Sequence, residues 1–400
     1  MKIPDILKVV YAPHKTFKET VENPSYLGPL IIIVLFIIAN VAFAYVSTST
    51  THIAQSVPGL TSKLDEWTEN STFWTSNAQK SESSDAINGS TYVPLQYYGN
   101  TSIAFSAVNC TQIVTELENI GTVNCSRPDG YDMMSLRIKW TSPQTKPPSN
   151  ITLYLFSANS SNHFYKSLED SLSNFTYNIW NNETISLGAS EGWSSSNSSV
   201  DWGSITGLKL EFTWPDTSDI TLLIDGLYFY GPSESLLEVY GTGYLLNIAL
   251  LVVMQFIITW VILSGLIYII TKGLRGKLVW KILMIAVGLT LITMFVQAAV
   301  NVAVYSAVPP VNCPFELIGG FRGETATDAA YNKIVEQTWL ADMIRSYMQI
   351  IVHVWTIALC ALALRILAGF SWTKSLLVGA TAYAIMLFIG SLGLGLTLFG

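Results

Sequence analysis

Five long apolar runs divide this chain of 400 residues into blocks of different character. Each run is close to the roughly 20 apolar residues that an α-helix needs to cross the hydrocarbon core of a bilayer. They predict five transmembrane helices, at residues 30–46, 244–270, 282–308, 344–367 and 376–399. The fold class expected for this part of the chain is a membrane α-helical bundle.

The block between the first and second runs has a different period. Short stretches alternate apolar and polar residues, are rich in β-branched and aromatic side chains, and are separated by turn residues, which is typical of half-buried strands. They lie at residues 101–107, 133–140, 151–156, 183–187, 206–214 and 220–230. Many short strands without an amphipathic helix predict an all-β sandwich or jelly roll within residues 47–243.

Ten N-glycosylation sequons lie in this β block, and the rest of the chain contains none. They begin at Asn70, Asn88, Asn100, Asn109, Asn124, Asn150, Asn159, Asn174, Asn182 and Asn197. A sequon is modified only where the chain meets an extracytoplasmic transferase. We therefore expect the block 47–243 to be extracellular and to carry N-linked glycans.

The basic residues give the same orientation. The net charge is −7, yet ten of the 21 Lys and Arg residues lie in residues 1–29, 272–281 and 365–374, with only three of the 28 acidic residues. Short segments rich in Lys and Arg face the cytoplasm. The sequons and the charges together predict a cytoplasmic N-terminus, an extracellular C-terminus and a location in the cell membrane.

Two segments outside the runs also show helical character. Pro13, Pro24 and Pro29 divide residues 1–29 into short amphipathic pieces, which we expect to lie on the inner membrane surface. Residues 316–342 repeat apolar side chains at helical spacing and predict an amphipathic helix within an extracellular loop at 309–343.

Four cysteines are few for a chain of this length. Cys110 and Cys125 share the extracellular block, where a disulfide can persist, and we expect them to pair. Cys313 is expected outside without an obvious mate, and Cys360 in the fourth run is expected to pack as an apolar side chain.

The second half of the β block resembles the galactose-binding-like jelly roll. The resemblance is carried by residues 163–165 (HFY), Trp180, 185–187 (ISL), Trp193, 201–202 (DW), Ile205 and 223–229 (LIDGLYF). Many members of that fold family bind carbohydrate, often with a structural calcium ion, and others hold partner proteins together. The resemblance implies a jelly roll over residues 61–231 with one of these roles.

Aromatic faces that stack on sugar rings would be the site residues of a carbohydrate-binding domain. The candidates are Trp74, Trp140, Tyr165, Trp180, Trp193 and Trp202. Each of them also suits a sandwich core, because aromatic side chains dominate core burial. Asp225 is a weak calcium candidate and is better suited to accept backbone hydrogen bonds at a strand end, since no Asp-x-Asp-x-Asp loop accompanies it.

The apolar runs and their connections resemble the Yip family, five-span proteins that interact with Ypt/Rab GTPases, and its prokaryotic relatives. The resemblance rests on residues 12–17 (APHKTF), 21–26 (VENPSY), 29–30 (PL), 272–277 (KGLRGK), Trp355, 364–365 (LR) and 371–375 (SWTKS). It implies five spans with the N-terminus inside, and the sequons favour an archaeal member. This chain departs from the family by inserting nearly 200 residues after the first span.

Polar residues inside the predicted spans are candidates for a conduit. Gln297 and Asn301 share one face of the third span, and Gln349 and His353 continue a stripe along the fourth. The alternative is an interhelical hydrogen-bond network that only stabilises packing. A metal site at His353 is not indicated, because no second His or Cys stands at ligand spacing.

The sequence contains no P-loop, dinucleotide-binding, nucleophile-elbow or HExxH motif, and no basic aromatic patch for nucleic acid. We therefore predict a non-enzymatic membrane protein of the cell envelope that needs no cofactor and whose extracellular domain recognises a partner protein or a glycan. The alternatives are a carbohydrate-binding or adhesion protein, which an exposed coplanar Trp/Tyr pair with nearby amides would favour, and a transporter of ions or small solutes.

Overall fold

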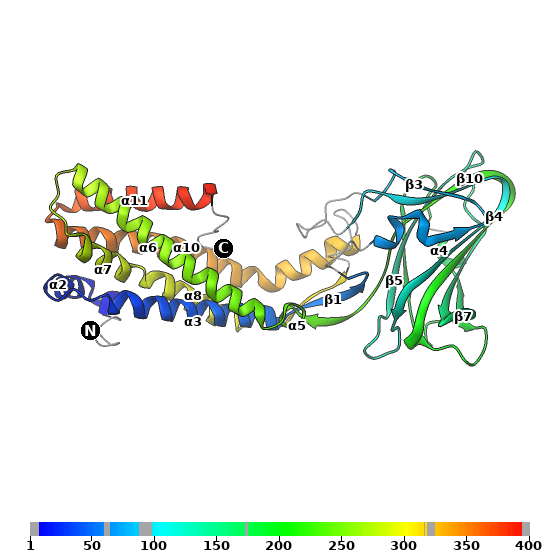
Figure 1. The fold of residues 1–400 in the computed structure, drawn as a ribbon, viewed down its shortest axis with the longest axis horizontal. Coiled ribbons are helices and arrows are strands. Elements are labelled where there is room, and N and C mark those ends of the chain that lie inside the picture. The colour runs from blue at the N-terminus through cyan, green and yellow to red at the C-terminus, as the bar shows by residue number, and fades with distance from the viewer. Residues whose placement is uncertain are drawn as a thin grey trace. The chain divides into compact units, whose positions relative to one another are not determined.

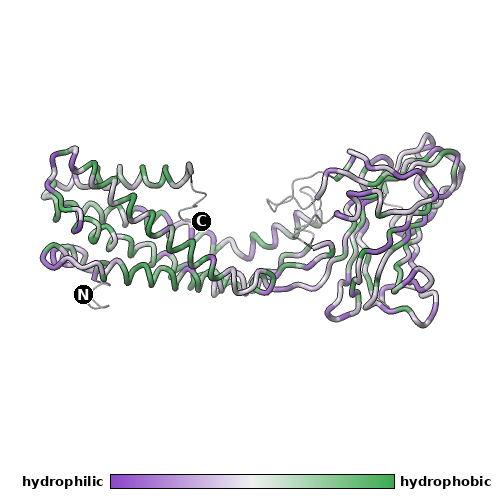
Figure 2. Tube along the Cα trace, in the orientation of Figure 1, coloured by the Kyte–Doolittle hydropathy of each residue, from purple (hydrophilic) through white to green (hydrophobic). Residues whose placement is uncertain are grey.

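The computed structural model describes residues 8–59, 65–87, 98–172, 175–315, 317 and 325–393. The chain divides into two compact units. The helical unit contains Met1–Thr51, Ser235–Val311 and Val335–Gly400, and the β unit contains His52–Glu234 and Asn312–Ile334. Figure 1 shows their elements, and Figure 2 shows that hydrophobic residues are concentrated along the helices.

The helical unit is built from long apolar helices. Its helices are α2 (Pro13–Glu22), α3 (Leu27–Thr50), α5 (Leu236–Tyr240), α6 (Gly243–Gly273), α7 (Trp280–Thr290), α8 (Ile292–Tyr305), α11 (Trp372–Gly393) and, from Val335 onward, α10 (Thr325–Ala368). Among the described residues, five helices are long and apolar enough to cross a membrane, with α7 and α8 counted together. They overlap the five predicted runs, which confirms the long apolar helices, whereas their membrane crossing and orientation stay predictions.

Close packing in this unit depends on a glycine. A Cβ atom at Gly288 on α7 would lie 2.7 Å from Pro29 and 2.8 Å from Trp260. The Trp260 indole on α6 donates a hydrogen bond to the backbone oxygen of Met284, at 2.7 Å. Small residues let membrane helices approach closely, so Gly288 permits contact between α3, α6 and α7.

Residues 316 and 318–324 of the predicted amphipathic helix at 316–342 lie outside the described residues, and its described part does not end before the fourth apolar run. From Thr325 the chain is helical without interruption to Ala368, so α10 includes both the amphipathic segment and the fourth apolar run. The physical reason is that residues 325–368 contain neither Pro nor Gly, so nothing in the sequence ends the helix between them.

The β unit contains eleven strands among its described residues. They are β1 (Thr51–Val57), β2 (Trp74–Ser76), β3 (Gln79–Ser83), β4 (Ser102–Val123), β5 (Met133–Thr141), β6 (Asn150–Ser157), β7 (Asn159–Ser167), β8 (Asn181–Ser186), β9 (Ser194–Ser195), β10 (Ile205–Ser235) and β11 (Val311–Cys313). Short helical turns lie between them at η1 (Glu66–Thr68), η2 (Ser71–Phe73), α4 (Glu169–Leu172) and η3 (Trp202–Ser204).

Two long strands are shared by both halves of the sheet. β4 and β10 pair antiparallel along most of their length, with register shifts between Thr213 and Ser218 and between Ser218 and Ile220. On one side of these shifts β10 also pairs with β5, and on the other side it pairs with β6. The first layer therefore has the order β3–β4–β10–β5–β8, and the second has the order β2–β4–β10–β6–β7–β9.

The two layers bury one common core. It contains Phe105 and Ile138 from the first layer together with Leu117, Leu153 and Leu208 from the second. These residues occupy every second position of their strands, as the period of two requires. The antiparallel β domain expected from the sequence is thus present.

The strand boundaries differ from the prediction in one systematic way. The predicted strands 206–214 and 220–230 are one strand, β10, and the predicted strand 101–107 extends to Val123 in β4. Pro215 and Asp216 indicated a turn, but they lie where the register shifts. A strand that bends at such an irregularity can pass from one layer to the other.

Candidate functional site

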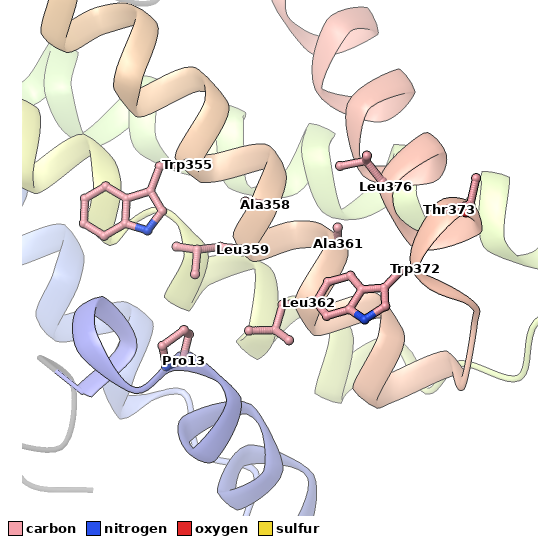
Figure 3. Close-up of a pocket in the computed structure, with 9 residues that line it drawn as sticks. All are labelled: Pro13, Trp355, Ala358, Leu359, Ala361, Leu362, Trp372, Thr373 and Leu376. Carbon is pink, nitrogen blue, oxygen red and sulfur yellow. The ribbon is translucent and has the colours of Figure 1, made fainter.

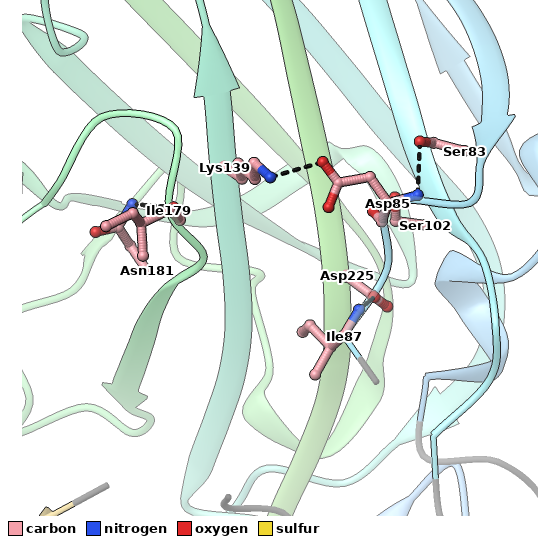
Figure 4. A network of polar contacts seen from close by, with 8 residues as sticks. All are labelled: Ser83, Asp85, Ile87, Ser102, Lys139, Ile179, Asn181 and Asp225. Atoms are coloured by element: carbon pink, nitrogen blue, oxygen red, sulfur yellow. Dashed lines mark hydrogen bonds and ion pairs between the residues drawn. The ribbon is translucent and has the colours of Figure 1, made fainter. Parts of the chain in front are cut away.

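The outer face of the first layer is covered. Ser135, Arg137 and Leu223 alternate with core residues, so they point away from the core, yet all three are buried. Residues 83–87 lie against this face, as Figure 4 shows. The Lys139 ammonium contacts Asp85 Oδ2 at 2.6 Å, and the Ser102 hydroxyl donates to the Asp85 backbone oxygen at 2.8 Å.

Asp225 is the buried anchor of the same network. Its Oδ2 accepts from the Ile87 N–H at 2.8 Å, and its Oδ1 accepts from the Gly226 N–H at 2.7 Å and from the Thr68 hydroxyl at 3.0 Å. Among the described residues no group of three or more His, Cys, Asp or Glu side chains is arranged to hold a metal ion. These donors favour the structural role of Asp225, and calcium binding there stays a prediction.

Asp65 is a second buried carboxyl near Asp225. Both of its oxygens accept from the Gly99 N–H, at 2.7 and 2.9 Å. Burial, and then the negative charge of Asp225, raise the pKa of Asp65 to about 7. Burial raises the pKa of Asp225 to about 6. The pair therefore makes the β unit sensitive to pH.

The outer face of the second layer is open. Its register places side chains of β4, β10, β6 and β7 in cross-strand rows, because paired residues point to the same side of a sheet. The central row contains Glu116, Lys209, Tyr154 and Tyr165. The row on one side of it contains Glu118, Gly207, Phe156 and His163, and the row on the other side contains Val114, Glu211, Thr152 and Ser167. We call this surface the open face.

Three rings meet on the open face. The rings of Tyr154 and Tyr165 have centroids 6.1 Å apart and an interplanar angle of 32°. The His163 ring lies 5.4 Å from Tyr154 and 6.2 Å from Tyr165. Tyr165 is 39% exposed, whereas Tyr154 and His163 are half-buried. The two tyrosines form a tilted pair whose accessible aromatic surface is supplied by Tyr165.

Charged groups fix the orientation of Tyr154. The Lys209 ammonium lies 3.8 Å from the centroid of the Tyr154 ring, a cation–π contact. The Tyr154 hydroxyl donates to Glu211 Oε2 at 3.2 Å, and Glu211 also accepts from the side-chain amide of Gln112. Burial and the neighbouring Glu211 charge raise the pKa of Tyr154, so its hydroxyl stays protonated as a donor.

The charge balance of the open face is negative. Glu116, Glu118 and Glu211 outnumber Lys209 in the rows around Tyr154. Burial and the neighbouring Glu118 raise the pKa of Glu116. Carboxylates are acceptors for hydroxyl donors but repel anions. The face is therefore suited to a neutral, hydroxyl-rich ligand.

A polar hollow of about 490 Å³ lies at one end of the open face. Its lining includes Glu118, Phe156, Asn159 and Thr206. Gly207 is required here, because a Cβ atom would lie 2.6 Å from the backbone oxygen of Leu117 and 3.0 Å from the Phe156 ring. The hollow extends the polar surface beyond the row that contains His163.

The predicted aromatic candidates are distributed over different environments. Trp74 and Trp140 are buried in the core. Trp180, Trp193 and Trp202 are half-buried, and Trp193 and Trp202 pack against the core, with Trp202 stacked on Phe164 at 4.0 Å. Of the six candidates, Tyr165 alone belongs to the rows of the open face.

The predicted disulfide between Cys110 and Cys125 is wrong, because both cysteines are free. Cys110 lies within β4, and Cys125 follows the end of that strand. An extended strand rises about 3.3 Å per residue, so the residues between them span tens of ångströms. Bridged Cα atoms lie roughly 4.4–6.8 Å apart, which this strand prevents. Burial raises the pKa of Cys125 to about 12, which keeps it a thiol.

Eight of the ten predicted glycosylation sites lie among the described residues, and Asn88 and Asn174 lie outside them. None of the eight is buried: Asn100, Asn109, Asn124, Asn159, Asn182 and Asn197 are exposed, and Asn70 and Asn150 are half-buried. Asn150 shares the open face with Thr152 and Ser167, to which its side chain is hydrogen-bonded. Their glycosylation stays a prediction.

The predicted polar residues of the spans lie in two settings. Gln297 and Asn301 on α8 are buried, and their side-chain oxygens have no hydrogen-bond partner among the described residues. Gln349 and His353 on α10 are half-buried, and the His353 Nδ1 lies 2.8 Å from the Tyr383 hydroxyl. Thr293 and Thr356 join α8 to α10 through their hydroxyls, at 2.7 Å. These contacts link α8 to α10 and α10 to α11.

Sequence reasoning missed most of the open face. Tyr154, Lys209 and Glu211 are polar or aromatic positions that alternate with core residues in strands already predicted. That alternation identifies outward positions, but it does not tell which strands are neighbours. The pairing of β6 with both β10 and β7 brings them together, and only the structure shows it.

No protein-family model matches this chain, and no curated protein matches it significantly. Solved structures with similarity include the family 11 carbohydrate-binding module of a cellulosomal cellulase of Clostridium thermocellum, at 12% identity and a TM-score of 0.28, over 42% of this chain and 94% of the module. The family 30 module of another cellulosomal cellulase of that organism is 13% identical with a TM-score of 0.28, and the match covers 42% of this chain and 95% of the module. A β-1,2-glucanase from Parabacteroides distasonis is 11% identical with a TM-score of 0.28, and the match covers 42% of this chain and 24% of the glucanase. Because these TM-scores are below 0.5, the fold assignment rests on the strand pairing described above.

Proposed function

We propose that this protein is a membrane-anchored surface protein whose β unit binds a neutral glycan on the open face, without a catalytic step. The observation that carries the proposal is the exposed Tyr165 ring beside Tyr154, set among hydrogen-bonding side chains. In this proposal the five apolar helices cross the membrane as a Yip-like bundle, and the sequons place the β unit outside the cell.

The chemistry of the open face supports a sugar as ligand. A sugar ring presents C–H groups on its faces and hydroxyl groups around its edge. The exposed Tyr165 ring offers an apolar surface for the first, and Glu116, Glu211 and Gln112 offer acceptors and a donor for the second. The excess of carboxylates favours neutral over acidic glycans.

A large hydrophobic protein interface is less well supported. Within the described part of the β unit, the exposed large hydrophobic side chains are Phe73, Val108, Tyr165, Ile179 and Tyr331. They come from different elements, whereas the central part of a protein interface is enriched in contiguous apolar and aromatic residues. A scaffold role that depends on such a patch is therefore the weaker hypothesis.

The test is a glycan array with the full-length protein in lipid nanodiscs, followed by calorimetry on the best ligand. Tyr165→Ala should weaken binding at least about tenfold, because an aromatic contact is worth roughly 0.5–1.5 kcal/mol and packing is lost as well. Tyr165→Phe should retain most of the affinity, since the ring remains.

Trp180→Ala is the matched control. Trp180 is a half-buried aromatic residue with Lys139 6.0 Å from its ring, on the side of the first layer. This variant should bind as the wild type does. Equal affinity of the Tyr165→Ala variant and the wild type, or the absence of any glycan ligand, would overturn the proposal.

A further inference from the structure

An apolar groove lies within the helical unit, at the connection between α10 and α11. It has a volume of about 520 Å³, within the usual range of small-molecule sites. Its lining includes Pro13 of α2, Trp355, Ala358 and Leu362 of α10, and Trp372 and Leu376 of α11. Figure 3 shows these side chains converging from the three helices.

Basic side chains stand at the same end of the helices. The Arg365 guanidinium lies 4.5 Å from the centre of the Trp372 ring, and the Lys374 ammonium lies 4.5 Å from that of Phe370. His14 and Lys15, which follow Pro13 on α2, are exposed. Residues 355–393 contain no Asp or Glu, so this end of α10 and α11 supplies no acidic charge.

The combination is that of an amphiphile site. Trp372 and Leu376 are each at least half exposed, so the groove is open along its side. A guanidinium that stacks on an indole still directs N–H donors outward, in a fork that suits phosphate oxygens. Tryptophan and basic residues lie at the membrane interface, and basic pockets between spans on the cytoplasmic side bind anionic headgroups.

We propose that this groove binds one anionic phospholipid of the inner leaflet. An acyl chain lies along Ala358 and Leu362, and the phosphate contacts Arg365. The inference rests on the part of the proposed function that places the five helices in a membrane. It is independent of glycan binding, because all of its residues belong to the helical unit.

The experiment is native mass spectrometry of the full-length protein released from nanodiscs of phosphatidylglycerol or phosphatidylcholine. The wild type should retain one phosphatidylglycerol, with at least about fivefold preference over phosphatidylcholine, because a basic residue near an anionic surface contributes roughly that factor. Arg365→Ala should reduce the preference to near unity. Ala358→Trp, which fills the groove, should remove the retained lipid of either kind.

Lys277→Ala is the matched control, because Lys277 is an exposed basic residue in the α6–α7 connection and does not line the groove. It should keep the wild-type preference. Arg365 is exposed, so its replacement removes the contact with Trp372 but leaves the buried core intact even where the Ala358→Trp variant fails to fold. Equal retention of the two lipids by the wild type, or an unchanged preference in the Arg365→Ala variant, would overturn the inference.

Two further outcomes separate the possible failures. A wild-type peak at twice the chain mass, lost in the Ala358→Trp variant, would assign the groove to a second copy and overturn the lipid site. Release of the protein from membranes by alkaline carbonate would instead contradict the membrane anchoring on which both proposals depend.

Discussion

The two units of this protein expose different chemistry although both bury apolar cores. In the β unit, period-two alternation sends one set of side chains into the core and leaves a polar outer surface on the second layer. In the helical unit, large hydrophobic residues such as Ile257, Val261 and Leu377 remain exposed beside a buried apolar core. The difference supports the proposal that the β unit faces water and the helical unit faces a hydrocarbon environment.

The largest expected effect comes from the core of the β unit. Trp140 is buried, and its ring is stacked against that of Phe175 with the centroids 6.3 Å apart. Its indole N–H donates a hydrogen bond to the Lys146 backbone oxygen at 3.1 Å. Trp140→Ala should lower the free energy of unfolding by roughly 3–5 kcal/mol, because it leaves a large cavity. Thermal unfolding of the full-length protein followed by near-UV circular dichroism measures this. A loss no larger than that of half-buried Trp180→Ala would contradict the assigned core.

Replacing an exposed apolar residue by aspartate in each unit compares the surroundings of the two units directly. Ile257 lies near the middle of α6 and is 44% exposed, and Val108 of the β unit is 80% exposed. Ile257→Asp should cost roughly 3 kcal/mol and reduce membrane insertion, because a carboxylate at the centre of a span is expensive. Val108→Asp should change stability by no more than about 0.5 kcal/mol. Similar insertion yields for the two variants would remove the distinction between the units.

The buried carboxyls predict a pH dependence in the stability of the β unit. The folded state holds the protons of Asp65 and Asp225 more tightly than the unfolded chain, whose carboxyls have pKa values near 3.8. Their contribution to stability is therefore complete below about pH 4 and is lost as the pH rises through about 6 to 7. Asp65→Asn should reduce the loss of unfolding free energy with rising pH by on the order of 2 kcal/mol. Chemical denaturation between pH 4 and 8 measures it, and stability that rises over this range would refute the sign.

The smallest effect concerns the predicted glycan at Asn150. Asn150 lies on the open face, so a glycan attached there would compete with an external ligand. Asn150→Gln should raise glycan affinity modestly, whereas Asn100→Gln, at an exposed position before β4, should leave it unchanged. Mass spectrometry of glycopeptides must first show occupancy at both sites. A loss of affinity in the Asn150→Gln variant would mean that its side chain contributes to binding.

Local patterns in the sequence predicted the elements better than their arrangement. The apolar runs correspond to long helices because a span of that length and composition has few alternatives, and alternation revealed β5, β6 and β8. The continuity of β10 through Pro215 could not be predicted, because turn residues also occur at bends between layers. The disulfide prediction failed for the related reason that spacing in sequence says nothing about extension in space.

The candidate site shows the same limit. Tyr165 was identified from its residue type, but Lys209 and Glu211 acquire significance only through their register with Tyr154. Conversely, Trp74 and Trp140 were plausible binding residues until the structure placed them in the core. Residue type alone does not distinguish an aromatic platform from an aromatic core, because both use the same side chains.

The most direct test of the account is saturation-transfer difference NMR with a neutral oligosaccharide from the array and the full-length protein in nanodiscs. Irradiation of the aromatic protons should transfer saturation most strongly to the ring C–H protons of one sugar unit, and Tyr165→Ala should abolish most of that transfer while Trp180→Ala preserves it. Transfer that is unchanged by Tyr165→Ala, or lost in the Trp180→Ala variant instead, would contradict binding on the open face.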